Sequence, residues 1–215
     1  HFAPELSTVK DLPAGAKVFS LAAALASDAA ILEKHLGRHA QNADNGFTAL
    51  NQAFFLDGGV VHVPAGQVVQ EPIQFVYVST TKQSGATFHP RNLVIAEADS
   101  QVTIVESYVA LGGAGYFTNA VTELLAGDNA HLEFLKFQDE AADAFHIAAL
   151  HGEPQRFVEA QRGSVVRGDV EEAGLDAPLG KEVEARNCEG APQTGALHAR
   201  VDAYHEDLAH LWIVL

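Results

Sequence analysis

The chain has 215 residues, of which 47% are hydrophobic, and it carries a single cysteine and a formal net charge of -15. This length and apolar content suffice for a sizeable core in one or two domains, and the single Cys188 excludes a disulfide framework within the chain. From Asn92 to Pro154 ten acidic residues stand against one basic residue, Lys136. We therefore expect no nucleic-acid partner, because such binding depends on Lys and Arg at phosphates.

The sequence shows no membrane or secretion signal. No apolar run approaches the length of about 20 residues that a membrane helix needs, and no basic and apolar leader precedes the first strand. We therefore expect a cytoplasmic protein with no membrane partner, and the lone thiol agrees with a reducing compartment. The chain begins with His1 and contains no methionine, so we expect it to be trimmed or incomplete.

Residues 1–58 are predicted to be an N-terminal helical segment. Ser20 is a suitable N-cap for a helix from Ser20 to Leu36, whose apolar residues recur at helical spacing and which ends at Gly37. A polar linker from His39 to Asn45 follows. A second short helix is predicted next, because four residues at helical spacing share one face: Phe47, Leu50, Asn51 and Phe54. Asp57, Gly58 and Gly59 end this helix.

From Val60 onward the pattern changes to strands. β-Branched and aromatic runs are interrupted by turn residues, and we expect a β core over residues 59–202. The predicted interruptions are a polar loop from Thr80 to Thr87, a turn from Gly112 to Gly115 and an acidic corner from Asp139 to Asp143. Val165-Val166 and Asp169-Val170 predict one more coil, and Ala203 to Leu215 predicts a C-terminal helical segment over residues 203–215.

Turn residues recur in the core at a nearly constant spacing. Gly66, Asp99 and Asp128 lie 33 and 29 residues apart, each before a β-rich run. Self-similarity at this spacing indicates stacked repeats, in which one coil cannot bury its apolar face without its neighbour. We therefore predict an all-β core in the form of a parallel β-helix rather than a jelly roll or a cupin barrel. The β-helix prediction places four residues in one core with parallel neighbours: Val102, Ile104, Leu132 and Phe134.

The histidines and Cys188 are weak candidates for metal binding. His35 and His39 are four residues apart, but Gly37 interrupts the helix that would align them. His62 and His146 lie in strand runs, where a hydrogen-bonded structural histidine is the simpler interpretation. His89 precedes a proline and is expected to fix a turn. We predict no catalytic and no metal-ligating residue, and the sequence leaves the cofactor-binding residues unknown.

Two other motifs were weighed as active sites. Asp139, Glu140 and Asp143 could serve as the paired carboxylates of a glycosidase, but a charged corner is the simpler interpretation, since such enzymes need two carboxylates opposed across a cleft. The Gly112–Gly115 turn lacks the Lys-Ser/Thr and the helix of a phosphate-binding loop. Val61 to Gly66 is similar to a cupin strand without the paired histidines and glutamate of a metal-binding cupin.

Four segments, in order and spacing, resemble the SufD branch of the SufB/SufD family: Asn45–Gly58, His89–Glu97, Tyr116–Glu123 and Ala144–Leu150. The resemblance implies a right-handed parallel β-helix with helical ends. It implies a non-catalytic scaffold subunit of an iron–sulfur assembly complex, with a SufB-like paralogue and a SufC-like ABC ATPase as partners. It further implies an iron–sulfur cluster in the assembled complex. For this chain alone we expect no tightly held cofactor, and a partner that is either a SufB-like protein or a second copy of the chain, which would form a homodimer in isolation.

Beyond Leu150 the resemblance weakens. Gly163–Val170 is similar to a coil of the family, and His198–Asp202 is similar to one of its sequence motifs. In contrast, Leu175–Gly180 departs from the turn that the family has at this place, and Ala203 replaces an expected histidine. The family's later Cys-Ser-His-Gly-Ala motif and its ATPase-docking tail have no counterpart in this sequence. Two alternatives remain open: a β-helix or cupin-like carbohydrate-active enzyme, and a purely structural repeat module.

Overall fold

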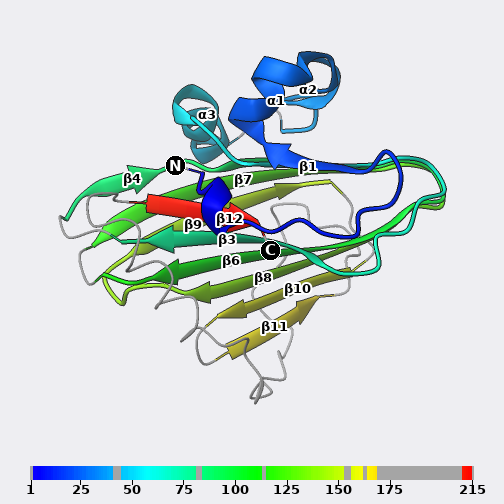
Figure 1. Ribbon diagram of the computed structural model, residues 1–215. Helices are drawn as coiled ribbons and strands as arrows, with labels where there is room; N and C mark the ends of the chain where they lie inside the picture. Colours follow the sequence, from blue (N-terminus) through cyan, green and yellow to red (C-terminus); the bar gives the residue numbers. More distant parts are fainter. Residues whose placement is uncertain are drawn as a thin grey trace.

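The computed structural model describes residues 2–40, 45–80, 84–112 and 115–152, together with three further strands at 156–161, 164–168 and 210–214. Strands dominate this part of the chain and form two six-stranded sheets, in which most neighbouring strands are parallel (Figure 1). The predicted all-β core is therefore confirmed. Neither sheet closes on itself within the described residues.

The two sheets are named here by their strands. Sheet I contains β1 (Lys17–Ser20), β2 (Gly59–Val63), β4 (Ala86–Phe88), β5 (Arg91–Ala96), β7 (Tyr116–Ala126) and β9 (Phe145–His151). Sheet II contains β3 (Ile73–Ser79), β6 (Gln101–Ala110), β8 (His131–Asp139), β10 (Arg156–Gln161), β11 (Ser164–Gly168) and β12 (His210–Val214). From β2 to β10 the chain passes back and forth between the sheets, and each new strand lies parallel to one from the previous passage.

The core lies between the sheets and confirms the predicted parallel stacking. Val102 of β6 is aligned with Leu132 of β8, and Ile104 with Phe134, in parallel register. All four are at most 2% exposed and belong to one apolar cluster with Val61, Val94 and Phe75, among others. Because side chains alternate along a strand, Val102 and Ile104 of β6, and Leu132 and Phe134 of β8, all point into this cluster.

The predicted 29-residue spacing between the turns at Asp99 and Asp128 is wrong by one residue. Asp99 lies over Asn129, 30 residues further on, and the Asn129 amide Nδ2 donates to Asp99 Oδ1 at 2.8 Å. Both residues have a positive φ, 57° for Asp99 and 55° for Asn129, and Gly66 at the preceding corner has a φ of 71°. Asp and Asn tolerate this left-handed backbone, so both Asp128 and Asn129 suited the turn, and the register of the apolar strands selected Asn129.

The first predicted helix divides into two. The helices are α1 (Leu21–Ser27) and α2 (Ala29–His35), separated by Asp28, whose carboxylate pairs with Lys17 of β1. Ser20 is confirmed as the N-cap, because its hydroxyl accepts from the Ala23 N–H at 3.0 Å. Gly37, with a φ of 74°, follows the end of α2 as predicted. A short 3-10 helix, η1 (Pro4–Leu6), precedes them.

The helices cover the outer face of sheet I (Figure 1). Leu21, Ala24 and Leu32 pack there against apolar residues of β2 and β5. The residues predicted to share one face of the third helix, α3 (Gly46–Phe54), differ in burial: Asn51 is buried together with Thr48, whereas the side chains of Phe47 and Phe54 are 44% and 60% exposed. Asn51 is buried because its amide donates to the carbonyls of Pro90 and Asn119, which satisfies backbone acceptors of sheet I.

Two predictions near the C-terminus are corrected. Residues 210–214 form strand β12, antiparallel to β3, in place of the predicted helix; the segment is rich in β-branched and aromatic residues, which favour a strand beside an open sheet edge. Val165 and Val166 lie in β11, which pairs with β10 in antiparallel fashion, so they do not form a further parallel coil. The short connection between β10 and β11 leaves no room for the dozen or so residues of a parallel crossover. Asp169-Val170 lies outside the described residues.

Candidate functional site

A cluster of polar side chains occupies the space between the two sheets. Its members, called the interior polar cluster, are Tyr77, Asn92, Glu106, Tyr108 and Thr122. Asn92 and Thr122 reach inward from β5 and β7 of sheet I, and the other three from β3 and β6 of sheet II. All five are at most 3% exposed, so each polar group needs a partner within the protein.

Glu106 is the hub of this cluster. Its Oε1 accepts from Asn92 Nδ2 at 2.8 Å and from Thr122 Oγ1 at 2.5 Å, and its Oε2 accepts from the Tyr108 hydroxyl at 2.8 Å. The Asn92 Oδ1 in turn accepts from the Tyr77 hydroxyl at 2.5 Å. Burial first, and then the charge of Glu106, raise the pKa of both tyrosines. The phenols therefore stay protonated and act as hydrogen-bond donors across the core.

A buried glutamate and histidine form a second polar group beside Tyr108. The Nδ1 of His146 lies 2.7 Å from Glu140 Oε2, and their side chains are 8% and 10% exposed. Burial by itself raises the pKa of Glu140, but hydrogen bonding to His146 and the charge of its ring outweigh this and place the pKa below its ordinary value. The His146 ring packs edge-on against Tyr108, with centroids 4.6 Å apart. Its Nε2 is buried and has no hydrogen-bond partner among the described residues.

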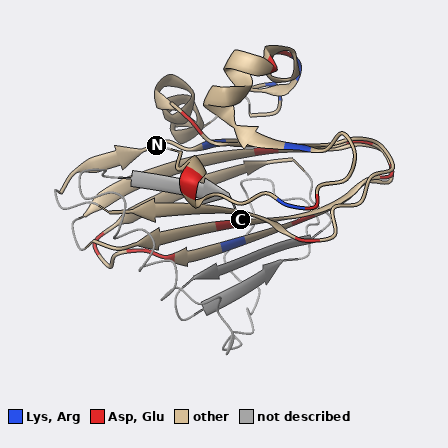
Figure 2. Cartoon of the chain, in the orientation of Figure 1, with Lys and Arg blue, Asp and Glu red and all other residues tan. Residues whose placement is uncertain are grey.

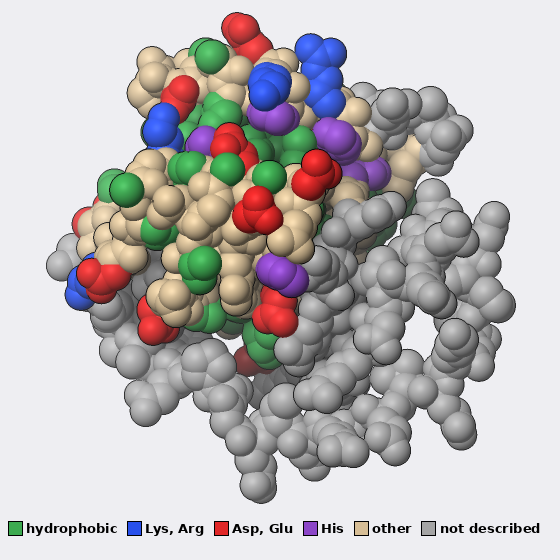
Figure 3. Space-filling model, turned by 90° about the vertical axis from the view of Figure 1, so that its right-hand side faces the viewer, with side chains coloured by type: hydrophobic (Ala, Val, Ile, Leu, Met, Phe, Trp, Pro, Cys, Tyr) green, Lys and Arg blue, Asp and Glu red, His purple; other side chains and the backbone are tan. Residues whose placement is uncertain are grey.

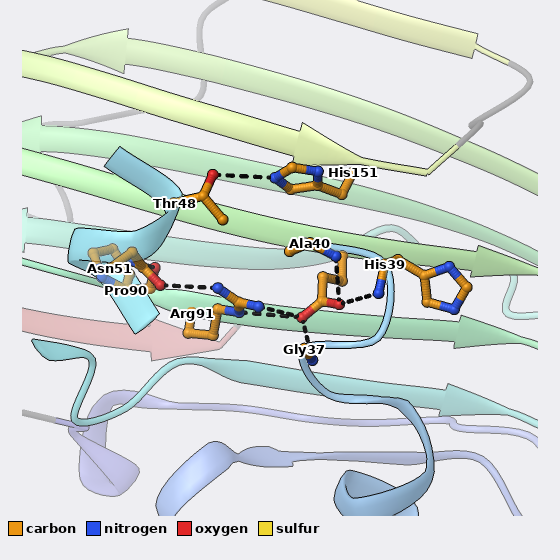
Figure 4. A network of polar contacts seen from close by, with 9 residues as sticks. Gly37, His39, Ala40, Thr48, Asn51, Pro90, Arg91 and His151 are labelled. Atoms are coloured by element: carbon orange, nitrogen blue, oxygen red, sulfur yellow. Dashed lines mark hydrogen bonds and ion pairs between the residues drawn. The ribbon is translucent and has the colours of Figure 1, made fainter. Parts of the chain in front are cut away.

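A third polar group lies on the outer face of sheet I, beneath the helices (Figure 4). Arg91 of β5 and Glu123 of β7 form an ion pair with Nη2 and Oε1 2.6 Å apart, and both side chains are 0% exposed. The Arg91 Nη1 also donates to Asn51 Oδ1 of α3 at 3.3 Å. Nearby, Thr48 Oγ1 of α3 lies 3.3 Å from the His151 ring of β9.

Glu123 also accepts three backbone hydrogen bonds. The N–H groups of Gly37, His39 and Ala40 lie 2.8, 3.1 and 3.2 Å from its two oxygens. Burial alone raises the pKa of Glu123, but the charge of Arg91 and these donors outweigh it, so the pKa lies below its ordinary value. The carboxylate therefore stays ionised and ties the segment after α2 to sheet I.

The histidines predicted to be structural are paired as expected. His62 Nε2 lies 2.8 Å from Glu97 Oε1, and His146 pairs with Glu140. His89 lies between β4 and β5, as the turn prediction requires, and burial lowers its pKa.

His35 and His39 do not share a helical turn, because α2 ends at His35. Burial lowers the pKa of His35, and the charges of Lys34, His39 and His62 lower it further. Several histidine side chains lie on the face of the molecule that Figure 3 shows. No group of three or more His, Cys, Asp or Glu side chains in the described part of the chain is arranged to hold a metal ion.

The acidic corner differs from its prediction at Glu140. Its side chain turns into the protein and pairs with His146, so Glu140 is not simply part of the charged corner that the sequence indicated. Asp143 is exposed. The ends of the Gly112–Gly115 turn lie between β6 and β7, both strands, so no helix opens there. Cys188 and the segments 175–180 and 198–203 lie outside the described residues.

Two family models match the chain. The model described as the SufBD protein N-terminal region matches residues 1–75, and the SufBD core domain of SUF system FeS cluster assembly matches residues 77–166. The chain belongs to the SufB/SufD family. The predicted family resemblance is thereby confirmed.

Individual relatives within the SufB/SufD family agree. Over 155 residues, 68% of this chain, it is 33% identical to an iron–sulfur cluster assembly SufBD family protein, slr0076, of Synechocystis sp., of which 34% is covered. It is 30% identical over 106 residues, 48% of this chain, to the iron–sulfur cluster assembly protein SufD of Bacillus subtilis, of which 24% is covered. The chain thus spans about a third or less of the length of these two SufB/SufD relatives.

Sequence reasoning missed the buried polar residues of this SufB/SufD chain. Asn51, Arg91, Asn92 and Glu123 all lie inside the segments that carry the family resemblance, but strand and helix patterns placed them as ordinary members of their elements. The available signal was a charged residue within an otherwise apolar run, such as Glu123 before two leucines. A charge in such a run requires a partner, although the sequence does not show which one.

Proposed function

We propose that this chain is a non-catalytic scaffold subunit of an iron–sulfur cluster assembly complex. The observation that carries the proposal is the match to the two SufBD family models over residues 1–75 and 77–166. We propose further that its partners are a SufB-like paralogue and a SufC-like ABC ATPase, and that the cluster belongs to the assembled complex. By this proposal the chain alone holds no cofactor tightly and acts in the cytoplasm.

The architecture supports a scaffold. The two sheets face each other, and the chain passes between them with parallel neighbours at every step from β2 to β10. We propose that these passages are the coils of a right-handed parallel β-helix. A stack of this kind leaves unpaired backbone groups at its end, which a neighbouring subunit can cover. We therefore expect a partner interface larger than about 1,000 Å².

The chemistry of the polar groups also favours a scaffold over an enzyme. The hub carboxylate of the interior polar cluster is engaged on both oxygens, by Asn92 and Thr122 on one and by Tyr108 on the other. Glu123 is likewise engaged by Arg91 and by backbone donors. Such satisfied buried groups stabilise one arrangement of the strands.

Co-purification tests the proposal. The chain would be expressed alone, with a SufB-like protein, with a SufC-like ATPase and with both, and each sample would be measured by size-exclusion chromatography with light scattering and by metal analysis. We expect a metal-free species alone, either a homodimer or a monomer, and a stable hetero-complex with the SufB-like protein. A strict monomer that carries stoichiometric zinc or iron and joins no complex would contradict the scaffold role and favour the cupin-like alternative.

A further inference from the structure

Several aromatic side chains are exposed together on one side of the helical layer. Phe47 and Phe54 of α3 are 44% and 60% exposed, and Phe145 at the start of β9 is 74% exposed. These are large values for phenylalanine, which is usually among the more buried residues. Single exposed apolar residues are normal, but a contiguous group marks a contact surface.

Ring contacts join these residues into one group. The Phe47 and Phe117 ring centroids are 6.3 Å apart, those of Phe54 and His89 are 5.7 Å apart, and those of His89 and Phe117 are 6.2 Å apart. Phe117 of β7 is aligned with Phe145 of β9 in parallel register, so the two side chains lie on the same face of sheet I. The aromatic surface is defined by these five residues: Phe47, Phe54, His89, Phe117 and Phe145.

The orientation of α3 leaves the aromatic surface exposed. Its inward face is occupied by Thr48 and Asn51, and Asn119 of β7 donates to the Phe47 carbonyl at 2.8 Å. Because these bonds fix the rotation of the helix, Phe47 and Phe54 cannot turn inward without leaving buried polar groups unpaired. The outward direction of the two phenylalanines is therefore set by the contacts of the helix.

The exposed charges carried by residues 45–152, the part of the chain that forms the aromatic surface, have one sign among the described residues. Within the described part of residues 45–152, the Lys and Arg residues are Arg91 and Lys136, which are 0% and 7% exposed. The exposed charges of this region are acidic (Figure 2). Among them, Asp143 is exposed two residues before Phe145. A basic partner is thus attracted here and an acidic partner is repelled.

We propose that the aromatic surface docks a protein partner through an amphipathic segment that places arginine or lysine around an apolar centre. Apolar side chains of the segment would cover the phenylalanine rings, and its guanidinium groups would pack on ring faces and pair with carboxylates such as Asp143. A second copy of this chain does not fit, because it would bring acidic surface against acidic surface. This contact is separate from the subunit contacts of the proposed function, and neither depends on the other.

The test uses a fluorescent 18-residue helical peptide of alternating leucine and arginine faces as the probe, measured by anisotropy against the full chain. We expect the F54S/F145S double variant to bind about tenfold or more weakly, as loss of a central aromatic pair implies. The matched control is Leu25→Ser on α1, whose side chain is 55% exposed but lies outside the surface. We expect it to bind like the parent, and circular dichroism would show that both variants remain folded.

Three results would overturn the proposal. The first is unchanged peptide binding by the double variant, which would mean that the peptide binds elsewhere or by net charge alone. The second is an equal loss with Leu25→Ser, which would mean that binding is not specific to the aromatic surface. The third is self-association of the parent chain that the double variant abolishes, which would assign the surface to contacts between copies. A peptide with glutamate in place of arginine completes the series and must not bind. Failure of co-purification with the SufB-like protein would leave these outcomes unaffected.

Discussion

Buried polar residues carry much of the specificity of this fold. An isolated carboxylate between two sheets would be strongly destabilising, yet Glu106 is 2% exposed and accepts three hydrogen bonds from both sheets. These bonds are satisfied only when Asn92 and Thr122 of sheet I face Glu106 of sheet II. A slip of one residue in any of these strands would turn its side chain to the other face. The cluster thus selects the register that the apolar residues allow.

The core packing of Phe134 gives the first prediction. Phe134 is 2% exposed and lies in the core between the sheets, so Phe134→Ala should lower the free energy of unfolding by about 3–5 kcal/mol through lost burial and the cavity left behind. The matched control is Phe145→Ala, also a strand residue but 74% exposed. We expect this control to cost less than about 1 kcal/mol. Urea denaturation would measure both, and equal costs would mean that the strand register is wrong.

At the scale of elements, the groups that lie beneath a helix decide which of its faces is buried. The Phe47 and Phe54 side chains of α3 are exposed, whereas Thr48 and Asn51 are buried. The carbonyls of Pro90 and Asn119 lie beneath the helix, and the Asn51 amide donates to both at 2.8 Å. A buried amide left without these acceptors would cost about 1–3 kcal/mol. The need to pair this amide therefore holds the Thr48 and Asn51 face of α3 against sheet I.

The close contact between Gly59 of β2 and the Phe75 ring of β3 gives the second prediction. A Cβ added at Gly59 would lie 2.3 Å from the Phe75 ring, closer than any real contact. Phe75 is 0% exposed and has no space to move, so Gly59→Ala should cost about 1–3 kcal/mol or more through overpacking. The control is Gly46→Ala at the start of α3, where nothing lies within 4 Å of the added atom. Alanine there should be neutral or stabilise by up to about 1 kcal/mol.

Thermal unfolding followed by circular dichroism would measure both glycine variants. The comparison separates steric conflict from the general effect of replacing glycine. An unchanged melting temperature for Gly59→Ala would mean that Phe75 does not pack over β2 as described.

At the scale of the whole molecule, one carboxylate joins the helical layer to sheet I. Glu123 on β7 binds Arg91 of β5 and the backbone of Gly37, His39 and Ala40, and Arg91 also binds Asn51 of α3. The segments that meet here are far apart in the sequence, since Gly37 and Glu123 are separated by 86 residues. Loss of this contact should therefore loosen the helices as a group.

The third prediction follows from the charge of Glu123. Glu123→Gln leaves Arg91 buried without its counter-ion, so we expect a loss of about 3–5 kcal/mol at neutral pH. The folded-state pKa of Glu123 is lowered, so its contribution is present above its unfolded pKa of about 4.3 and is lost as the pH falls through the lower folded value. Parent and variant should therefore converge in stability below this window. Urea denaturation from pH 7 to pH 3 would measure the difference.

A surface ion pair supplies the control for this experiment. Glu97 pairs with His62 at 2.8 Å, and its side chain is 47% exposed. Glu97→Gln should cost less than about 1 kcal/mol, because solvent screens an exposed pair. A cost for Glu123→Gln as small as that for Glu97→Gln would show that the buried pair does not hold the helices to the sheet.

The sequence by itself determined the features whose cause is local. Ser20 caps α1 because a hydroxyl there reaches an N–H three residues on. The turns at Gly37, just after α2, and at Gly66 and Asp99 follow from the tolerance of these residues for left-handed backbone. The alternation of apolar residues determined which face of β6 and β8 is buried, because Val102, Ile104, Leu132 and Phe134 all lie on the side of the core.

The tertiary structure alone decided the features that depend on residues far apart in the chain. The inward turn of Glu140, the burial of Thr48 and Asn51 on α3 and the binding of Glu123 to Gly37 each require a partner whose identity no local pattern reveals. The same holds for the strand at 210–214, which pairs with β3 more than 130 residues earlier. The physical reason is that a polar group or a sheet edge must be satisfied by whatever lies nearest in space, and only the folded chain fixes which groups are near.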